Sequence, residues 1–212
     1  GHADSGDSFS LDMAMSHLTA DVICRTIFST PLAAGVSSDV FEDFTEFEQS
    51  VAQVDIFRLI FQKAWAKMPQ PPGVLAACQR IRGHLGDLVD PHLENPGAFN
   101  DIASDVIAAK DSDTGEAFTR EELIDQLGVF FLAGHETSAS ALTWVFYLLA
   151  EQPTLVLRLR KELEHVVGSG PINFNHVKQL PLVRAVFRET LRLYPPITFI
   201  PRVALEDCQI GP

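Results

Sequence analysis

The feature that most constrains this sequence is a long segment that contains no proline and begins with a helix-capping pattern. Thr119 and Glu122 stand three residues apart, as in a capping box, where a hydroxyl and a carboxylate each accept a hydrogen bond from the other residue's backbone amide. The next proline is Pro153. A helix over this segment would have about 33 residues and a length of about 50 Å. Because such a helix crosses a whole domain, other helices must pack around it.

The rest of the chain also has mostly helical patterns, with apolar residues at three- and four-residue spacing and prolines or glycines between the segments. We predict a mainly α fold with a minor β segment near the C-terminus, where residues 197–210 alternate in polarity as a strand does. The other predicted helices cover residues 11–28, 39–51, 56–66, 74–89, 100–110, 153–167 and 182–193.

Charge and cysteine content exclude several classes of protein. The 16 basic and 28 acidic residues give a net charge of −12, which repels a phosphate backbone, so we expect no nucleic-acid partner. The three cysteines form no Cys-x-x-Cys pair, which argues against a disulfide framework and favours a reducing, cytoplasmic location.

No secretory signal is recognisable. The most apolar stretch, residues 127–150, has polar residues at its centre, so we predict a buried helix and no membrane partner.

Those polar residues form the sequence Ala133-Gly-His-Glu-Thr137 in the middle of the long helix. In one interpretation they are satisfied core residues: Thr137 bonds back to a carbonyl one turn earlier, and Glu136 pairs with a distant cation. A zinc protease would need a second histidine one turn after His135, but Ala139 stands there. The zinc interpretation is therefore disfavoured.

A second polar pair lies on the last predicted helix. Glu189 and Arg192 are three residues apart, so they share one face of that helix. Taken alone, such a pair is more often an exposed ion pair than a functional site. This helix has few other positions that suit solvent, and Tyr194-Pro-Pro follows it.

Together the two motifs resemble those of the cytochrome P450 family. The segment 133–137 is similar to the family's oxygen-activating motif, Ala/Gly-Gly-x-Asp/Glu-Thr, and Glu189-x-x-Arg192 is similar to its Glu-x-x-Arg helix. The order of the motifs and the long helix agree with the family as well. The resemblance implies a monooxygenase that uses haem b to insert one atom of O2 into a small organic, mostly apolar substrate. Its electrons would come from NAD(P)H through a ferredoxin or a reductase.

The resemblance also implies roles for single residues. Glu136 would relay protons and Thr137 would donate a hydrogen bond during oxygen activation, so both are candidate catalytic residues. Glu189 and Arg192 would be structural and hold the haem-binding loop. The candidate haem-binding residues are Ala133, Gly134, which would leave a groove beside the haem, and Arg202, which would bind a propionate. The candidate substrate-binding residues are Val129, Leu132, Ile197, Thr198 and Phe199, beneath a mobile helix pair formed by residues 39–90.

One part of the family pattern is absent from the sequence. The haem-ligand motif, Phe-x-x-Gly-x-Arg-x-Cys-x-Gly, does not occur, and the surroundings of Cys208 do not match it. We therefore expect residues 1–212 to be the central part of one P450-like domain, truncated at both ends, with the axial cysteine outside this chain. Such a chain should be inactive, and poorly stable or prone to aggregation. The alternatives are a non-catalytic helical binding or scaffold protein and an inactive P450 remnant.

Overall fold

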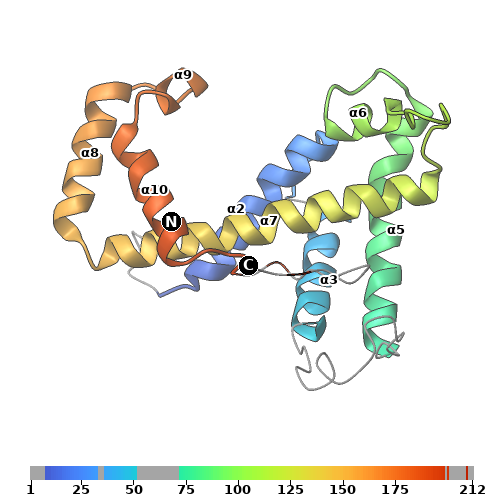
Figure 1. Cartoon of the computed structure of the whole chain (residues 1–212), viewed down its shortest axis with the longest axis horizontal. Helices are drawn as coiled ribbons and strands as arrows, with labels where there is room; N and C mark the ends of the chain where they lie inside the picture. Colours follow the sequence, from blue (N-terminus) through green and yellow to red (C-terminus); the bar gives the residue numbers. More distant parts are fainter. Residues whose placement is uncertain (1–7, 33–35, 52–71, 199, 201–208, 210–212) are drawn as a thin grey trace. The chain divides into compact units, whose positions relative to one another are not determined.

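The computed structural model describes residues 8–32, 36–51, 72–198, 200 and 209 (Figure 1). This part of the chain is mainly helical, as predicted, and contains no β-strand; one isolated bridge joins Lys110 and Ala117. The helix predicted at 56–66 and most of the strand predicted at 197–210 lie outside the described residues. The helices are α2 (Leu11–Phe28), α3 (Val36–Val51), α5 (Pro72–Glu94), α6 (Ile102–Ala108), α7 (Arg120–Ala150), α8 (Pro153–Val167), α9 (Phe174–Val177) and α10 (Pro181–Leu193). None of them combines the length and the apolar composition that a membrane span requires.

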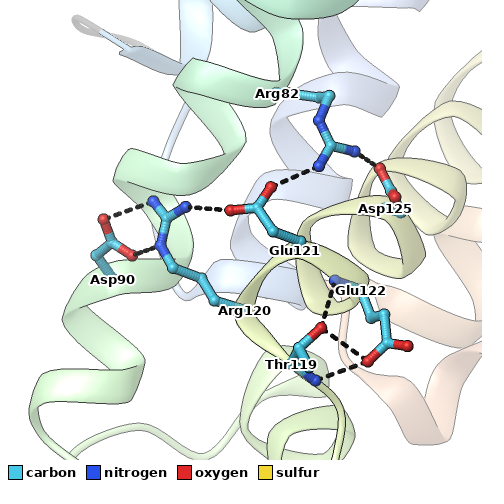
Figure 2. Close-up of polar contacts among 7 residues, drawn as sticks. All are labelled: Arg82, Asp90, Thr119, Arg120, Glu121, Glu122 and Asp125. Carbon is cyan, nitrogen blue, oxygen red and sulfur yellow. Dashed lines mark hydrogen bonds and ion pairs between the residues drawn. The ribbon is translucent and has the colours of Figure 1, made fainter.

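The long helix predicted from the capping box is α7, which has 31 residues. The Thr119 N–H donates to Glu122 Oε2 at 2.8 Å, and the Glu122 N–H donates to Thr119 Oγ1 at 3.3 Å (Figure 2). The hydrogen bond from the Thr119 backbone also lowers the pKa of the Glu122 carboxyl. The cap thus satisfies backbone amides and places negative charge in the first turn, where the helix dipole favours it.

α5 is longer than its sequence pattern predicts. The prediction ends this helix before Pro91, but α5 continues to Glu94. Proline lacks a backbone N–H, so the helix loses one hydrogen bond at this point. The ring of His92 holds the last turn, because its Nδ1 lies 3.0 Å from Leu88 O and its Nε2 lies 3.0 Å from Asp101 Oδ2. These contacts extend the helix beyond its sequence signal.

Local signals set the ends of α8 and α10. Both helices begin with a proline in the first turn, where the missing N–H costs no helical hydrogen bond. α8 ends at Gly168, whose φ of +64° suits glycine. The N-cap residue of α10 is Leu180, which forms no side-chain cap. Glu162 of α8 caps α10 instead, since its carboxylate accepts the Leu182 and Val183 amides at 2.8 and 3.1 Å.

Contacts divide the chain into two compact units, and α2 and α7 contribute to both. The α8–α10 unit contains α8, α9 and α10 with residues 11–19 of α2 and 135–150 of α7. The α3–α6 unit contains α3, α5 and α6 with residues 20–28 of α2 and 120–134 of α7. The main hydrophobic core lies in the α3–α6 unit and includes Cys24, Ile27, Phe28, Phe41, Phe44, Leu85, Val89, Leu123, Ile124, Leu127 and Phe131.

Candidate functional site

His135, the histidine of the polar segment, lies on the buried face of α7. Leu127, Phe131 and His135 recur every four residues, and all three are at most 2% exposed. The carbonyl of His135 accepts a 2.9 Å hydrogen bond from the hydroxyl of Thr19 on α2. The four-residue spacing of His135 with Phe131 is a sequence signal for its burial. Thr19 gives no such signal, because a helical threonine ordinarily bonds within its own helix, as Thr19 also does to Met15 O at 3.0 Å.

The opposite side of α7 carries the predicted catalytic residues. Glu136 is exposed and Thr137 is half-buried. Ala133 and Val129 lie one and two turns before Thr137 and are exposed, Val129 with 60% of its surface. The structure therefore brings four of the predicted residues to the accessible part of one helix and leaves the Glu136 carboxylate in contact with solvent.

Gly134 packs against α2. A Cβ atom at this position would lie 2.5 Å from Ile23 Cδ1, closer than real Cβ contacts allow. Glycine is therefore the residue that lets α7 and Ile23 approach without a shift. The groove that the resemblance implies beside a haem stays a prediction, and contact with Ile23 is the role that the structure adds.

The α3–α6 unit contains an apolar pocket of about 210 Å³ lined by α3, α5 and α7. Val129 and Leu132, which the resemblance assigns to the substrate, both line it. Most of α3 and of α5 lies within the segment 39–90 that we expect to cover a substrate pocket. The remaining lining residues are Phe44, Phe47, Cys78, Ile81, Arg82, Leu85, Ile124, Asp125 and Gly128. Phe44 and Phe47 belong to an aromatic stripe that by its sequence suits either the core or a pocket lid. The other seven residues have no sequence signal for a pocket, because their meeting depends on how three helices pack.

Glu189 and Arg192 form the pair that their spacing predicts. Arg192 Nε and Nη2 donate to Glu189 Oε2 and Oε1 at 2.8 and 2.7 Å, and this contact lowers the pKa of Glu189. The two side chains are 57% and 66% exposed, so the pair adds little stability. Beyond it, Tyr194 stacks on Trp144 of α7 with ring centroids 4.0 Å apart and ring planes within 5°. Neither aromatic residue has a sequence signal for this stacking.

The other predicted site residues follow α10. Ile197 and Thr198 are exposed. Phe199 and Arg202 lie outside the described residues. Their proposed contacts with substrate and haem therefore stay predictions.

The described cysteines do not offer a metal ligand on the exposed side of α7. Cys24 is fully buried in the core, and Cys78 lines the apolar pocket. Cys208 lies outside the described residues. In the part of the chain that the structure covers, no three His, Cys, Asp or Glu side chains are grouped so that they could hold a metal ion.

Known proteins match both the sequence and the fold. The chain is 29% identical over 211 residues to cyclooctatin synthase of Streptomyces melanosporofaciens, a match that covers 93% of this chain and 43% of that protein. It is 39% identical over 116 residues to a bifunctional cytochrome P450/NADPH–P450 reductase of Gibberella moniliformis, covering 55% of this chain and 10% of that protein. The crystal structure of the cytochrome P450DA heme domain matches with a TM-score of 0.71 at 18% identity, covering 88% of this chain and 38% of that one. The chain thus spans less than half the length of these three proteins.

The match to the family is wider than any of its motifs. The profile of the family described as "Cytochrome P450" matches residues 2–211, nearly the whole chain. The helical fold agrees with a solved P450 domain, and the polar segment of α7 and the Glu189–Arg192 pair lie within the matched residues. The chain belongs to the cytochrome P450 family.

Proposed function

We propose that the protein is a haem-thiolate monooxygenase that inserts one oxygen atom of O2 into an organic, mostly apolar substrate. The observation that carries this proposal is the accessible side of α7, which presents Ala133 and Glu136 with Thr137 in the order of the oxygen-activating motif. The same helix lines an apolar pocket through Val129 and Leu132. One helix would thus supply both the reacting side chains and part of the substrate's surroundings.

The exposed side of α7 fits one face of a flat cofactor. Ala133 is exposed and has a small side chain, so a haem ring could lie close to the helix there. Cys24 is buried in the core, Cys78 lines the pocket, and the surroundings of Cys208 do not match the haem-ligand motif. We therefore assign the haem thiolate to a cysteine outside this chain and expect residues 1–212 alone to be inactive. Arg202 would bind a propionate. When bound, haem supplies the iron centre that binds and activates O2.

Glu136 and Thr137 would manage protons at this site. The Glu136 carboxylate is exposed, so it can exchange protons with solvent. A threonine hydroxyl both donates and accepts hydrogen bonds, so Thr137 can receive a proton and pass it on. Together the two side chains would carry protons from solvent to the reacting oxygen, while Val129 and Leu132 would contact the substrate.

Electrons would come from NAD(P)H through a ferredoxin or a reductase. One relative is named as a bifunctional cytochrome P450/NADPH–P450 reductase, which supports a reductase as the donor. The absence of a Cys-x-x-Cys pair from the sequence favours a reducing compartment, so we assign the protein to the cytoplasm.

Replacement of Thr137 tests this function in the protein as its source organism makes it, loaded with haem and supplied with NAD(P)H and a reductase. In Thr137→Ala, nicotinamide oxidation should continue, while product formed per nicotinamide should fall by at least about tenfold and peroxide should appear. Thr143→Ala is the matched control, because Thr143 lies on the same helix outside the motif.

The control variant should keep the coupling of the natural protein. Equal coupling in Thr137→Ala and the natural protein would contradict the catalytic role of Thr137. A protein that takes up no haem, with two variants that differ from it only slightly in stability, would support the scaffold interpretation instead.

A further inference from the structure

A polar contact joins α2 to α7 one residue before the predicted catalytic pair. The Thr19 hydroxyl of α2 lies 2.9 Å from the carbonyl oxygen of His135 on α7. Glu136 and Thr137 follow His135 directly in the sequence. All four residues belong to the α8–α10 unit, so this contact and the catalytic pair lie in the same compact part of the chain.

The Thr19 hydroxyl acts as a donor at this position. Thr19 is 6% exposed, and its Oγ1 lies 2.9 Å from His135 O, 3.0 Å from Met15 O and 3.1 Å from Ser16 O. Because a carbonyl oxygen carries no proton, the single hydroxyl proton must serve these three acceptors. The shortest of the three distances is the one to α7. Thr19 therefore bonds across to α7 as well as back into its own helix.

This hydrogen bond differs in kind from the apolar packing between the same two helices. In the α3–α6 unit, α2 and α7 contribute Cys24, Ile27, Leu127 and Phe131 to the hydrophobic core. Apolar attraction depends on the area buried and has no preferred direction. A hydrogen bond has a preferred distance and a preferred angle. The Thr19 bond can therefore set the rotation of α7 about its axis at the start of the motif.

The residue before His135 is also in contact with α2. Ile23 stands four residues after Thr19, so the two side chains share one face of α2. Within the α3–α6 unit, Ile23 Cδ1 lies 2.5 Å from the position that a Cβ atom of Gly134 would occupy. Two neighbouring residues of α7 thus contact α2, one through close packing and the other through a hydrogen bond.

A small rotation of α7 would displace the catalytic pair by a distance that matters for catalysis. Side-chain atoms of a helix lie about 5–6 Å from its axis, so a rotation of about 10° moves them by about 1 Å. A displacement of about 1 Å at a reacting group can lower a rate about a hundredfold. A contact that restricts the rotation of α7 at His135 therefore affects how Glu136 and Thr137 are presented.

We propose that Thr19 is a positioning residue for Glu136 and Thr137: its hydrogen bond to the His135 carbonyl fixes the turn of α7 that carries both side chains. Thr19 acts through this carbonyl, because its own side chain is buried and its proton is already donated. The role of Glu136 and Thr137 in proton transfer rests on the proposed function. The fixed turn itself rests on the contact between α2 and α7.

Amide hydrogen exchange, followed by mass spectrometry, tests the fixed turn in the protein as its source organism makes it. Thr19→Val removes the hydroxyl and keeps a branched side chain. Exchange in peptides that cover residues 135–140 should become roughly threefold to tenfold faster, as expected for the loss of one buried hydrogen bond. Thr19→Ser keeps the hydroxyl and should restore the natural rate. Natural exchange rates in peptides from α8 would show that the change in Thr19→Val is local.

Thr26→Val is the matched control on the same helix. The Thr26 hydroxyl donates to Val22 O at 2.7 Å, within α2, and Thr26 is exposed. Loss of this hydroxyl should therefore leave exchange at residues 135–140 unchanged. Equal exchange rates there in Thr19→Val and Thr26→Val would overturn the proposal. If valine at position 19 prevents folding, Thr19→Ala removes the same hydroxyl with a smaller side chain and gives the same comparison.

Carbon monoxide bound to the reduced, haem-loaded protein reports the position of the catalytic pair. Its infrared stretching band responds to hydrogen-bond donors beside the haem, so Thr137→Ala should shift the band. Thr19→Val should shift it in the same direction by a smaller amount, since Thr137 keeps its hydroxyl but lies in a different position. Thr19→Ser and Thr26→Val should leave the band of the natural protein. A merely structural role of Thr19 would lower stability without this shift.

The two measurements separate this proposal from the proposed function. A band that shifts in Thr137→Ala but not in Thr19→Val would overturn the positioning role of Thr19 and keep the proposed function. A protein without haem, in which exchange at residues 135–140 still rises in Thr19→Val and not in Thr26→Val, would support the fixed turn and contradict the proposed function.

Discussion

The α3–α6 unit and the α8–α10 unit are both helical, but different interactions stabilise them. In the α3–α6 unit, side chains from several helices are buried together, among them Phe28, Phe44 and Phe131. In the α8–α10 unit, α8 and α10 each have a single buried residue, Leu159 and Thr190. Several large apolar side chains of that unit are exposed, including Leu157, Phe187 and Leu193. The first unit has a continuous apolar core, whereas α8 and α10 of the second unit bury few side chains.

The difference shows that helices in this chain have two physical origins. α8 and α10 follow from signals near their ends: a proline in each first turn, Gly168 after α8, and the Glu162 cap on α10. Their helical form therefore requires little burial. α3 and α5 depend on the core they share with α7, since burial of apolar surface is the main favourable contribution there. Substitutions should separate the two cases by the size of their effects.

Replacement of Phe131 should cause the largest loss of stability. Its ring is fully buried and stacks on Phe44 with centroids 5.0 Å apart. Phe131→Ala should lower the free energy of unfolding by about 3–5 kcal/mol, because it removes buried surface and leaves a cavity. Urea unfolding followed by circular dichroism measures this change. Phe174→Ala is the control in the α8–α10 unit: its side chain is 75% exposed, and the expected change is within about 0.5 kcal/mol. Equal losses would remove the contrast between the units.

Replacement of Asp101 should have an intermediate effect that depends on pH. Burial raises the pKa of this carboxyl, but hydrogen bonds from His92, Ser29 and Ser104 outweigh burial and lower the pKa to about 2. Because the folded pKa lies below the ordinary value of 3.8, the carboxylate stabilises the fold at neutral pH and loses this effect as pH falls from about 4 to about 2. Asp101→Asn should therefore cost about 2 kcal/mol near pH 7 and much less near pH 2.

Unfolding measured across this pH range checks the prediction for Asp101. Asp87→Asn, at an exposed position of α5, is the matched control and should leave the pH profile unchanged. A pH-independent loss in Asp101→Asn would show that the charge of the carboxylate is not what stabilises the junction of α2, α5 and α6.

Replacement of Glu189 should have the smallest effect on the 212-residue chain. Glu189 and Arg192 are both largely exposed, so solvent replaces their contact when it is lost. Glu189→Gln should leave the urea midpoint unchanged within the precision of the measurement. A loss comparable to that of Asp101→Asn would mean that the α8–α10 unit depends on this pair.

The sequence predicts the elements whose signals are local. The Thr119–Glu122 capping box predicts α7, and Pro153 with Gly168 predicts the ends of α8. The sequence does not predict the end of α5, because the turn after Pro91 is held by Asp101, the N-cap residue of α6. Contacts between distant segments decide such cases, and a pattern within one helix does not contain them.

The candidate site also has some features that the sequence predicts and others that only the folded chain shows. The motif around Glu136 and the spacing of Glu189 and Arg192 can be recognised in the sequence. They suffice to indicate the resemblance to the cytochrome P450 family. The sequence does not predict the contact of Gly134 with Ile23 or the hydrogen bond from Thr19 to His135. In each pair the two residues are more than a hundred positions apart.

The measurement that tests the central claim most directly is the reduced carbon monoxide difference spectrum of the protein as its source organism makes it. We propose that the accessible side of α7 at Ala133 lies against one face of a thiolate-bound haem. We therefore predict the absorption band typical of a cytochrome P450, and loss of bound haem in Ala133→Trp with the helical circular dichroism retained. Absence of haem from the natural protein, or a spectrum typical of histidine-ligated haem, would contradict the account.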